Sequence, residues 1–234
     1  MRLRLLRRKN FKLPRKFTQA KIMDFEAVVR EVGKKYEELD AIRESVLNLS
    51  RKIVRSCAQS VKLAHRGEWE KVDAILATVA GQVSRLKESV APLLEVGVAN
   101  YAITPEQEFC EVVLLSKILR ELPLPRPGDL GVSPLAYLTG AADVVGELRR
   151  YCLDSVRNGS IDEGVRAFEK MEEILDALFT LDFPSGLIPG LRKKVDMARR
   201  VVNATRSDVT FAVQARRVSL SLSPSDGGDR NGRS

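Results

Sequence analysis

Apolar residues recur at every third or fourth position along most of the chain, which is the spacing that gathers them on one face of an α-helix. The longest such run extends from residue 23 to residue 66. Nowhere do apolar and polar residues alternate as they would along a strand. The pattern therefore predicts an all-α fold, a single-domain bundle of about six or seven helices. After the first helix it places others over about residues 68–96, 104–122, 134–158, 161–181 and 191–218.

Residues that commonly end helices support these boundaries. Thr104 and Pro105 are typical of an N-cap and a first helical position. Ser133 and Pro134 form the same pair before the next helix. The Pro- and Gly-rich segment 123–134 predicts a loop between two helices and not a domain boundary, because the composition is alike on its two sides.

The composition excludes several classes of protein. The chain is 44% hydrophobic and 30% charged, which supports a folded core, and it has no run of about 18 apolar residues that would span a membrane. Its three cysteines include no C-x-x-C pair, which argues against a disulfide framework or a zinc site and fits a cytoplasmic protein. His65 is the single histidine, expected to be a cap or surface residue. Any chemistry must therefore depend on carboxylates, lysines or a metal ion.

The net charge of +8 comes from the start of the chain. Residues 1–22 hold nine Lys and Arg and no acid, which leaves 30 of the 39 basic residues against all 31 acidic residues. Two interpretations stay open: a basic arm that binds nucleic acid, or a true start of the protein at Met23. We therefore divide the chain into a basic extension (1–22), a helical domain (23–218) and a C-terminal tail that is expected to be disordered (219–234).

The third predicted helix places two carboxylates on its apolar face. Glu108 and Glu111 fall on the apolar stripe, whereas Glu106 falls on the opposite, polar side. An unpaired carboxylate is costly to bury, and a cation shared by several acids offsets that cost. The alternative is that the two acids occupy an exposed first turn, where the helix dipole favours negative charge.

The fourth predicted helix carries a second pair of acids, Asp143 and Glu147, one turn apart. They lie opposite the apolar stripe of this helix, in line with Gly140 and Arg150. A glycine inside a helix costs about 1 kcal/mol relative to alanine, a cost that close approach of a ligand at Gly140 would offset, and Arg150 could hold a phosphate. The alternative is a solvated helix face. With the pair on the preceding helix, these residues make four acids on two helices, which indicates a metal site.

The fourth-helix segment resembles the signature of the translin/TRAX family. Residues 134–162, PLAYLTGAADVVGELRRYCLDSVRNGSID, contain the family's pattern Y-L-x-G-x-A-D-x-x-G-E-L-x-R and depart from the family at Ser160, where members often have Asp. The segments SRKIVRSCAQSVKLAHR (50–66) and EQEFCEVVLL (106–115) are also similar to TRAX. The similarity extends over about residues 25–217 and leaves out the basic extension.

This resemblance implies both an assembly and an activity. All-α subunits of the family form a hollow octameric barrel that binds RNA inside, and TRAX-type subunits are metal-dependent endoribonucleases. The implied cofactor is Mg²⁺ or Mn²⁺. The implied catalytic and metal-binding residues are Glu108, Glu111, Asp143 and, as a nearby fourth, Glu147.

The resulting prediction is an Mg²⁺-dependent endoribonuclease that cleaves single-stranded or short RNA, either as a homo-octamer or together with a translin-like chain. Arg150, Lys62 and Arg66 are the basic residues expected to contact RNA. Two alternatives stay open: a translin-like protein that binds RNA or single-stranded DNA without cleaving it, and a helical adaptor with no nucleic-acid role. Divalent ions distinguish the predicted nuclease from the translin-like binding protein. They weaken binding through phosphates, but a metal-dependent nuclease requires them.

Overall fold

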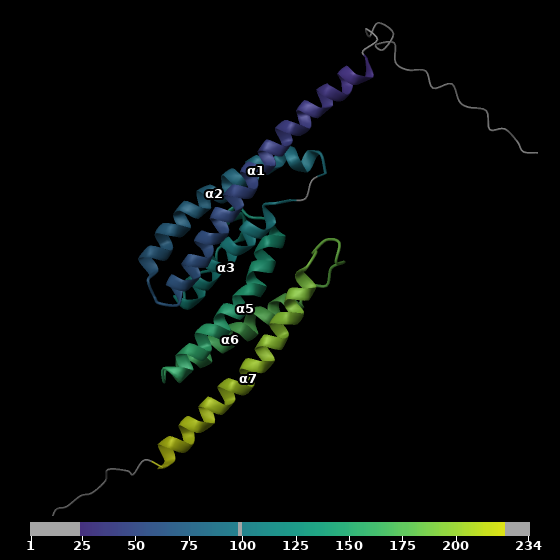
Figure 1. The fold of residues 1–234 in the computed structure, drawn as a ribbon. Coiled ribbons are helices and arrows are strands. Elements are labelled where there is room, and N and C mark those ends of the chain that lie inside the picture. Colours follow the sequence, from purple (N-terminus) through teal and green to yellow (C-terminus); the bar gives the residue numbers. More distant parts are fainter. Residues whose placement is uncertain (1–23, 98–99, 223–234) are drawn as a thin grey trace, which may run out of the picture. The chain divides into compact units, whose positions relative to one another are not determined.

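The computed structural model describes residues 24–97 and 100–222, and every regular element in these residues is a helix (Figure 1). The predicted all-α class is therefore confirmed. The predicted basic extension and residues 223–234 of the predicted tail lie outside the described residues. None of the described helices is both long and apolar enough to cross a membrane. The helices are α1 (Phe25–Ala64), α2 (Trp69–Glu95), α3 (Ile103–Leu119), α4 (Pro127–Leu130), α5 (Pro134–Arg157), α6 (Ile161–Phe179) and α7 (Leu191–Leu222).

The start and the end of α5 are specified by local sequence. Ser133 is the N-cap, and its hydroxyl accepts a hydrogen bond of 3.3 Å from the backbone N–H of Ala136. Pro134 occupies the first helical position, where a backbone N–H is not needed. After the C-cap Asn158, Gly159 adopts a φ of 86°, which ends the helix. Both predicted ends of this helix are confirmed.

Other boundaries differ from the prediction. Thr104 was predicted as the N-cap of α3, and this was wrong, because the helix begins at Ile103. The same helix ends at Leu119, before residue 122, and α4 forms one turn inside the predicted loop. The last helix continues beyond residue 218 to Leu222. No side chain caps the start of α3, and differences of one or two residues are common at such ends.

The described residues divide into two compact units, one that ends at Ala41 and one that begins at Ile42. The boundary lies inside α1, where the hydrophobic spacing continues without a break, so the sequence pattern does not reveal it. In the first unit the apolar face of α1 is exposed. We call this face the α1 stripe, and it consists of Phe25, Val28, Val29, Val32 and Tyr36.

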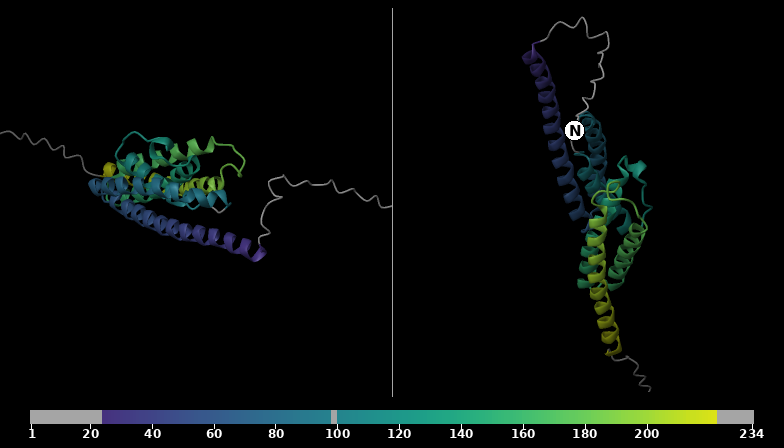
Figure 2. Two further views of the ribbon diagram at one scale, coloured as in Figure 1. Left: turned by 90° about the horizontal axis from the view of Figure 1, so that it is seen from above. Right: turned by 90° about the vertical axis from the view of Figure 1, so that its right-hand side faces the viewer.

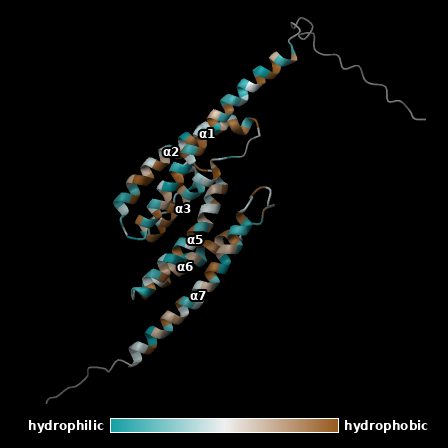
Figure 3. Ribbon diagram, viewed as in Figure 1, coloured by the Kyte–Doolittle hydropathy of each residue, from teal (hydrophilic) through white to brown (hydrophobic). Residues whose placement is uncertain are grey.

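In the second unit, α5 is the helix against which most others pack. It contacts α3, α6 and α7, and α6 also contacts α7, so that α5, α6 and α7 lie side by side in all views (Figures 1 and 2). Hydrophobic and hydrophilic residues alternate in bands along these helices (Figure 3), as in amphipathic helices around a shared core. Six helices contribute large, fully buried core residues, among them Ile53, Leu86, Leu93, Leu115, Leu148, Met171 and Leu191.

The two glycines of α5 have different surroundings. A Cβ atom on Gly140 would lie 2.8 Å from the Cβ of Cys110 and 2.8 Å from the backbone oxygen of Gln107, both on α3. A Cβ atom on Gly146 would meet nothing within 4 Å. The close approach of a ligand was predicted at Gly140, and this prediction was wrong. The group that approaches closely is the backbone of α3.

We expect Gly140→Ala to lower the free energy of unfolding by about 1–3 kcal/mol, because the new methyl group meets backbone atoms that cannot move independently of α3. The control is Gly146→Ala, which adds the same methyl group to the same helix in open space. It should raise the free energy of unfolding by about 0.5–1 kcal/mol through helix propensity. Urea denaturation followed by circular dichroism measures both. A stabilising Gly140→Ala would contradict the close packing of the two helices.

Candidate functional site

Four carboxylates from α3 and α5 lie close enough to affect one another electrostatically. Burial raises the pKa of Glu111 to about 8, with further contributions from the charges of Glu108, Asp143 and Glu147. Burial and the charges of Asp143 and Glu147 also raise the pKa of Glu108. The structure therefore brings together the four acids that the sequence placed on two helices, and we call them the acidic cluster.

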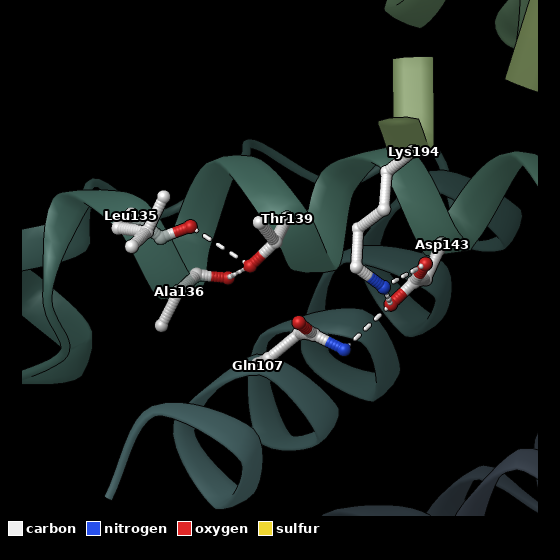
Figure 4. A network of polar contacts seen from close by, with 6 residues as sticks. All are labelled: Gln107, Leu135, Ala136, Thr139, Asp143 and Lys194. Atoms are coloured by element: carbon white, nitrogen blue, oxygen red, sulfur yellow. Dashed lines mark hydrogen bonds and ion pairs between the residues drawn. The ribbon is translucent and has the colours of Figure 1, made fainter. Parts of the chain in front are cut away.

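Asp143 is held by two partners from different helices (Figure 4). The side-chain amide of Gln107, on α3, donates a hydrogen bond of 2.7 Å to Oδ2. The ammonium of Lys194, on α7, lies 2.7 Å from both Oδ1 and Oδ2. Three helices thus meet at one carboxylate, and its negative charge is neutralised by a lysine.

Glu147 is held by the only histidine of the chain. The Nε2 atom of His65, at the C-terminal end of α1, lies 2.6 Å from Oε2 of Glu147. An ionised carboxylate can only accept, so Nε2 carries the proton in this hydrogen bond. This bond is the largest cause of a lowered pKa at Glu147, and Arg150 at 4.0 Å adds a smaller effect. His65 directly follows Ala64, the last residue of α1, as predicted for a cap, but its side chain is only 8% exposed, so the alternative prediction of a surface residue was wrong.

The thiol of Cys57, on α1, lies close enough to Glu108 and Glu111 to be affected by their charges. Burial, followed by the charges of Glu108 and Glu111, raises the pKa of Cys57 to about 12. Burial also raises the pKa of Cys110, on α3, to about 12. Both thiols remain protonated at neutral pH and are unsuited to act as nucleophiles or metal ligands.

The charges of the acidic cluster are balanced unevenly. On α5, Asp143 and Glu147 have close cationic or hydrogen-bonding partners. On α3, the raised pKa values of Glu108 and Glu111 show that negative charge is disfavoured there. Within the described part of the chain, no three His, Cys, Asp or Glu side chains are arranged to hold a metal ion as they stand. A cation could enter only if some of these side chains moved.

Glu106 differs most from its predicted position. It was predicted on the polar side of the third helix, but it is only 2% exposed. Its carboxylate accepts a hydrogen bond of 2.8 Å from the backbone N–H of Ser133, at the start of α5. This acid therefore ties α3 to α5 and is a structural residue. A helical wheel could not identify it because its partner is a backbone group distant in sequence.

The three predicted RNA contacts lie outside the acidic cluster. Arg150 is exposed and lies 4.0 Å from Glu147. Lys62 is exposed near the end of α1, and Arg66 is exposed and lies 3.8 Å from Glu68. Their role in binding RNA stays a prediction.

Sequence reasoning missed three residues that contact the acidic cluster: Gln107, His65 and Lys194. Gln107 lies one residue before Glu108, and its polarity next to a mostly buried helix face was a usable signal. His65 and Lys194 lie on other helices, and nothing in their local sequence indicates a carboxylate partner.

Comparisons with known proteins extend over most of the chain. A model described as the Translin family matches residues 34–205, a span that contains the acidic cluster and its partners. The uncharacterized protein MJ0175 of Methanocaldococcus jannaschii is 31% identical over 177 residues, which is 75% of this chain and 78% of that protein. Translin-associated protein X of Pongo abelii is 43% identical over 47 residues, which is 20% of this chain and 16% of that protein.

Two similar solved structures are those of AfC3PO. Its crystal structure has a TM-score of 0.71 at 33% sequence identity, covering 80% of this chain and 98% of that chain. Its complex with duplex RNA has a TM-score of 0.67 at the same identity, covering 80% of this chain and 97% of that chain.

The raised pKa of Glu111 makes stability depend on pH. Its value of about 8 in the folded protein exceeds the ordinary value of 4.5, so the folded state keeps a proton that the unfolded chain releases. Stability is therefore unaffected below about pH 4.5 and falls as the pH rises from there to about 8. Glu111→Gln removes this loss, so in EDTA we expect it to raise the free energy of unfolding at pH 8 by about 1–3 kcal/mol.

The measurement is thermal unfolding of both proteins in EDTA between pH 5 and pH 8.5. The control is Glu88→Gln, at an exposed position of α2. The gain from Glu111→Gln should increase with pH, while the effect of the control stays constant. A gain that is the same at every pH would contradict the coupling of Glu111 to burial and to the other acids.

Proposed function

This chain belongs to the translin family, and on that premise we propose that it binds RNA and hydrolyses it at the acidic cluster in a metal-dependent reaction. The observation that carries this proposal is the convergence of four carboxylates from α3 and α5, two of them with raised pKa values. Similarity to AfC3PO, which has been solved with duplex RNA, supports RNA as the ligand. The short similarity to translin-associated protein X supports a TRAX-type subunit.

The donor atoms of the acidic cluster suit a small, hard divalent cation. Carboxylate oxygens are the ligands that Mg²⁺ and Mn²⁺ prefer. The raised pKa values of Glu108 and Glu111 are a further reason, because a divalent cation would remove the disadvantage of ionising both. We therefore propose Glu108, Glu111, Asp143 and Glu147 as the residues that hold the ion.

Each part of the site then has a distinct task. Gln107 fixes the orientation of the Asp143 carboxylate, and His65 fixes that of Glu147, so both acids are positioned before substrate arrives. A bound divalent cation would favour the ionised forms of Glu108 and Glu111, against the burial that raises their pKa values. The chemistry that the ion supplies when bound is polarisation of the scissile phosphate and a lower pKa for an attacking water.

A second candidate function is RNA binding without cleavage, as in a translin-like protein. The observation that favours it is the arrangement of the acidic cluster, in which the described residues form no ready metal site. Under this alternative, Mg²⁺ would only weaken RNA binding by competing for phosphates.

We also propose that copies of this chain assemble into the octameric barrel that the family resemblance implies, either alone or with a translin-like chain. The α1 stripe supports assembly, because five large apolar side chains that recur at helical spacing are exposed on one helix. Exposed apolar patches of this kind commonly mark protein interfaces. A second copy of the chain offers the same stripe, so a self-complementary contact is available.

For the proposed reaction we expect labelled single-stranded and duplex RNA to be cut in Mg²⁺ and left intact in EDTA. Glu108→Gln and Asp143→Asn should each lower the rate by more than about 100-fold, the order that loss of a charge-stabilising group costs at other catalytic sites. Cleavage is followed by denaturing gel electrophoresis, and circular dichroism checks that each variant is folded.

The matched control for this reaction is Asp154→Asn, which neutralises an acid on the same helix as Asp143 but paired with Arg157 at 2.9 Å. It should cleave RNA at the wild-type rate. RNA that is bound but never cut, with Asp143→Asn indistinguishable from wild type, would leave the non-catalytic alternative.

For the proposed assembly we expect the double variant Val28→Asp/Val32→Asp to shift the protein toward smaller species, because charges replace the centre of the α1 stripe. Light scattering coupled to size exclusion measures the mass against 26.1 kDa per chain. The control Arg30→Gln/Lys34→Gln lowers the net charge by the same amount on the opposite face of the helix. Equal masses for the two double variants would rule out the stripe as an interface.

A further inference from the structure

Lys194, on α7, pairs with Asp143, one of the four proposed metal ligands. Its ammonium lies 2.7 Å from each carboxylate oxygen, so one cation contacts both oxygens. The Lys194 side chain is 31% exposed and that of Asp143 is 27% exposed. The pair is therefore partly open to solvent and accessible to ions.

Buried apolar residues around Lys194 account for the attachment of α7 better than this ion pair does. Leu191 and Val195, the neighbours of Lys194 on the inner face of α7, are both buried, as is Ala198 one turn later. Burial of such side chains contributes more to stability than an ion pair that is partly exposed. The position of Lys194 is thus better explained by its effect on the acids than by support of the fold.

The charge of Lys194 extends over the acidic cluster. Besides pairing with Asp143, it lowers the pKa values of Glu108 and Glu111, against the larger effect of burial. Lys194 nevertheless supplies one positive charge, placed on Asp143, to a cluster of four carboxyl groups. Lys194 therefore stabilises the acidic cluster in part and leaves it able to gain from a stronger cation.

We propose that Lys194 is a displaceable counter-ion of the acidic cluster: it neutralises Asp143 in the metal-free protein, leaves the carboxylate when a divalent cation binds, and then contacts a phosphate of bound RNA. This inference rests on the proposed function, because it requires both a metal ion and RNA at the same site.

The chemistry of lysine suits both positions. An ammonium on a flexible four-carbon chain can swing away from Asp143 without movement of the helix. Beside a divalent cation it would be repelled and would need a new anion, and RNA supplies a phosphate close to the scissile bond. Asp143 keeps the hydrogen bond from Gln107, so its orientation does not depend on Lys194. Lys194 is thus a positioning residue that couples metal binding to RNA binding.

The first experiment measures Mn²⁺ affinity by isothermal titration calorimetry, without RNA. Lys194→Met removes the competing cation and should bind Mn²⁺ about tenfold more tightly, the factor that corresponds to one charge-assisted contact. Lys193→Met is the matched control, since it removes the same charge from the neighbouring, exposed position, and it should change the affinity by less than about twofold. Lys194→Arg, which keeps the charge, should not bind Mn²⁺ more tightly.

The second experiment measures RNA affinity at constant ionic strength, in Ca²⁺ and in EDTA, with Asp143 intact. In Ca²⁺ the ammonium is released from Asp143, so Lys194→Met should weaken RNA binding several-fold relative to wild type. In EDTA the ammonium remains on Asp143, and the variant should bind RNA as wild type does. A loss of equal size in both conditions would overturn the proposal, because it would make Lys194 a fixed phosphate contact.

The results also separate this inference from the proposed function. If wild type binds Mn²⁺ and cleaves RNA but Lys194→Met has the same Mn²⁺ affinity, only the displaceable counter-ion is overturned. If neither protein binds Mn²⁺, both proposals fail. Tighter Mn²⁺ binding by Lys194→Met together with a Ca²⁺-dependent loss of RNA affinity supports the inference.

Discussion

The contact between α3 and α5 at Gly140 determines where the acidic cluster lies. Because Gly140 has no Cβ, the backbone of α3 can come within a distance at which a side chain would collide with Cys110 and Gln107. This approach lets Gln107 reach Asp143 and places Glu111 beside the acids of α5. The intrinsic cost of a glycine in a helix interior, about 1 kcal/mol, is offset by a helix contact that no larger residue permits.

The same close approach gives the site its electrostatic character. Bringing two pairs of acids together in partly buried surroundings raises the pKa values of Glu108 and Glu111, so ionising them disfavours the folded state at neutral pH. His65 and Lys194 contact the acids of α5, and Lys194 offsets the raised pKa values of Glu108 and Glu111 only in part. Local conflicts of this kind are typical of functional sites, where stability is given up for chemistry.

Helices and their ends could be predicted because they depend on local pattern, whereas contacts between residues distant in sequence could not be predicted. The helical periods and the Ser133–Pro134 start of α5 could be predicted because neighbouring residues determine them. The four residues of the acidic cluster could be proposed as a site because acids recur there at helical spacing and because the family resemblance implies them. The roles of Glu106, His65 and Lys194 could not, since each depends on a partner from another part of the chain. Close helix packing and a nearby ligand both explain a glycine inside a helix, so the sequence could not distinguish these two roles for Gly140.

The electrostatics of the acidic cluster also bear on the choice between a nuclease and a simple RNA-binding protein. Four carboxylates repel a phosphate backbone, so a protein whose only task was to hold RNA would bind it more tightly without them. They also lower the stability of the fold, because burial and the neighbouring acids disfavour the ionised form of Glu111. The proposed divalent cation would reverse both disadvantages at once, because it would favour ionised acids and attract phosphate. The acidic cluster contains acids with raised pKa values, and a lysine is already paired with one of its members. These two features are therefore explained better by a cation site than by a surface that only binds RNA.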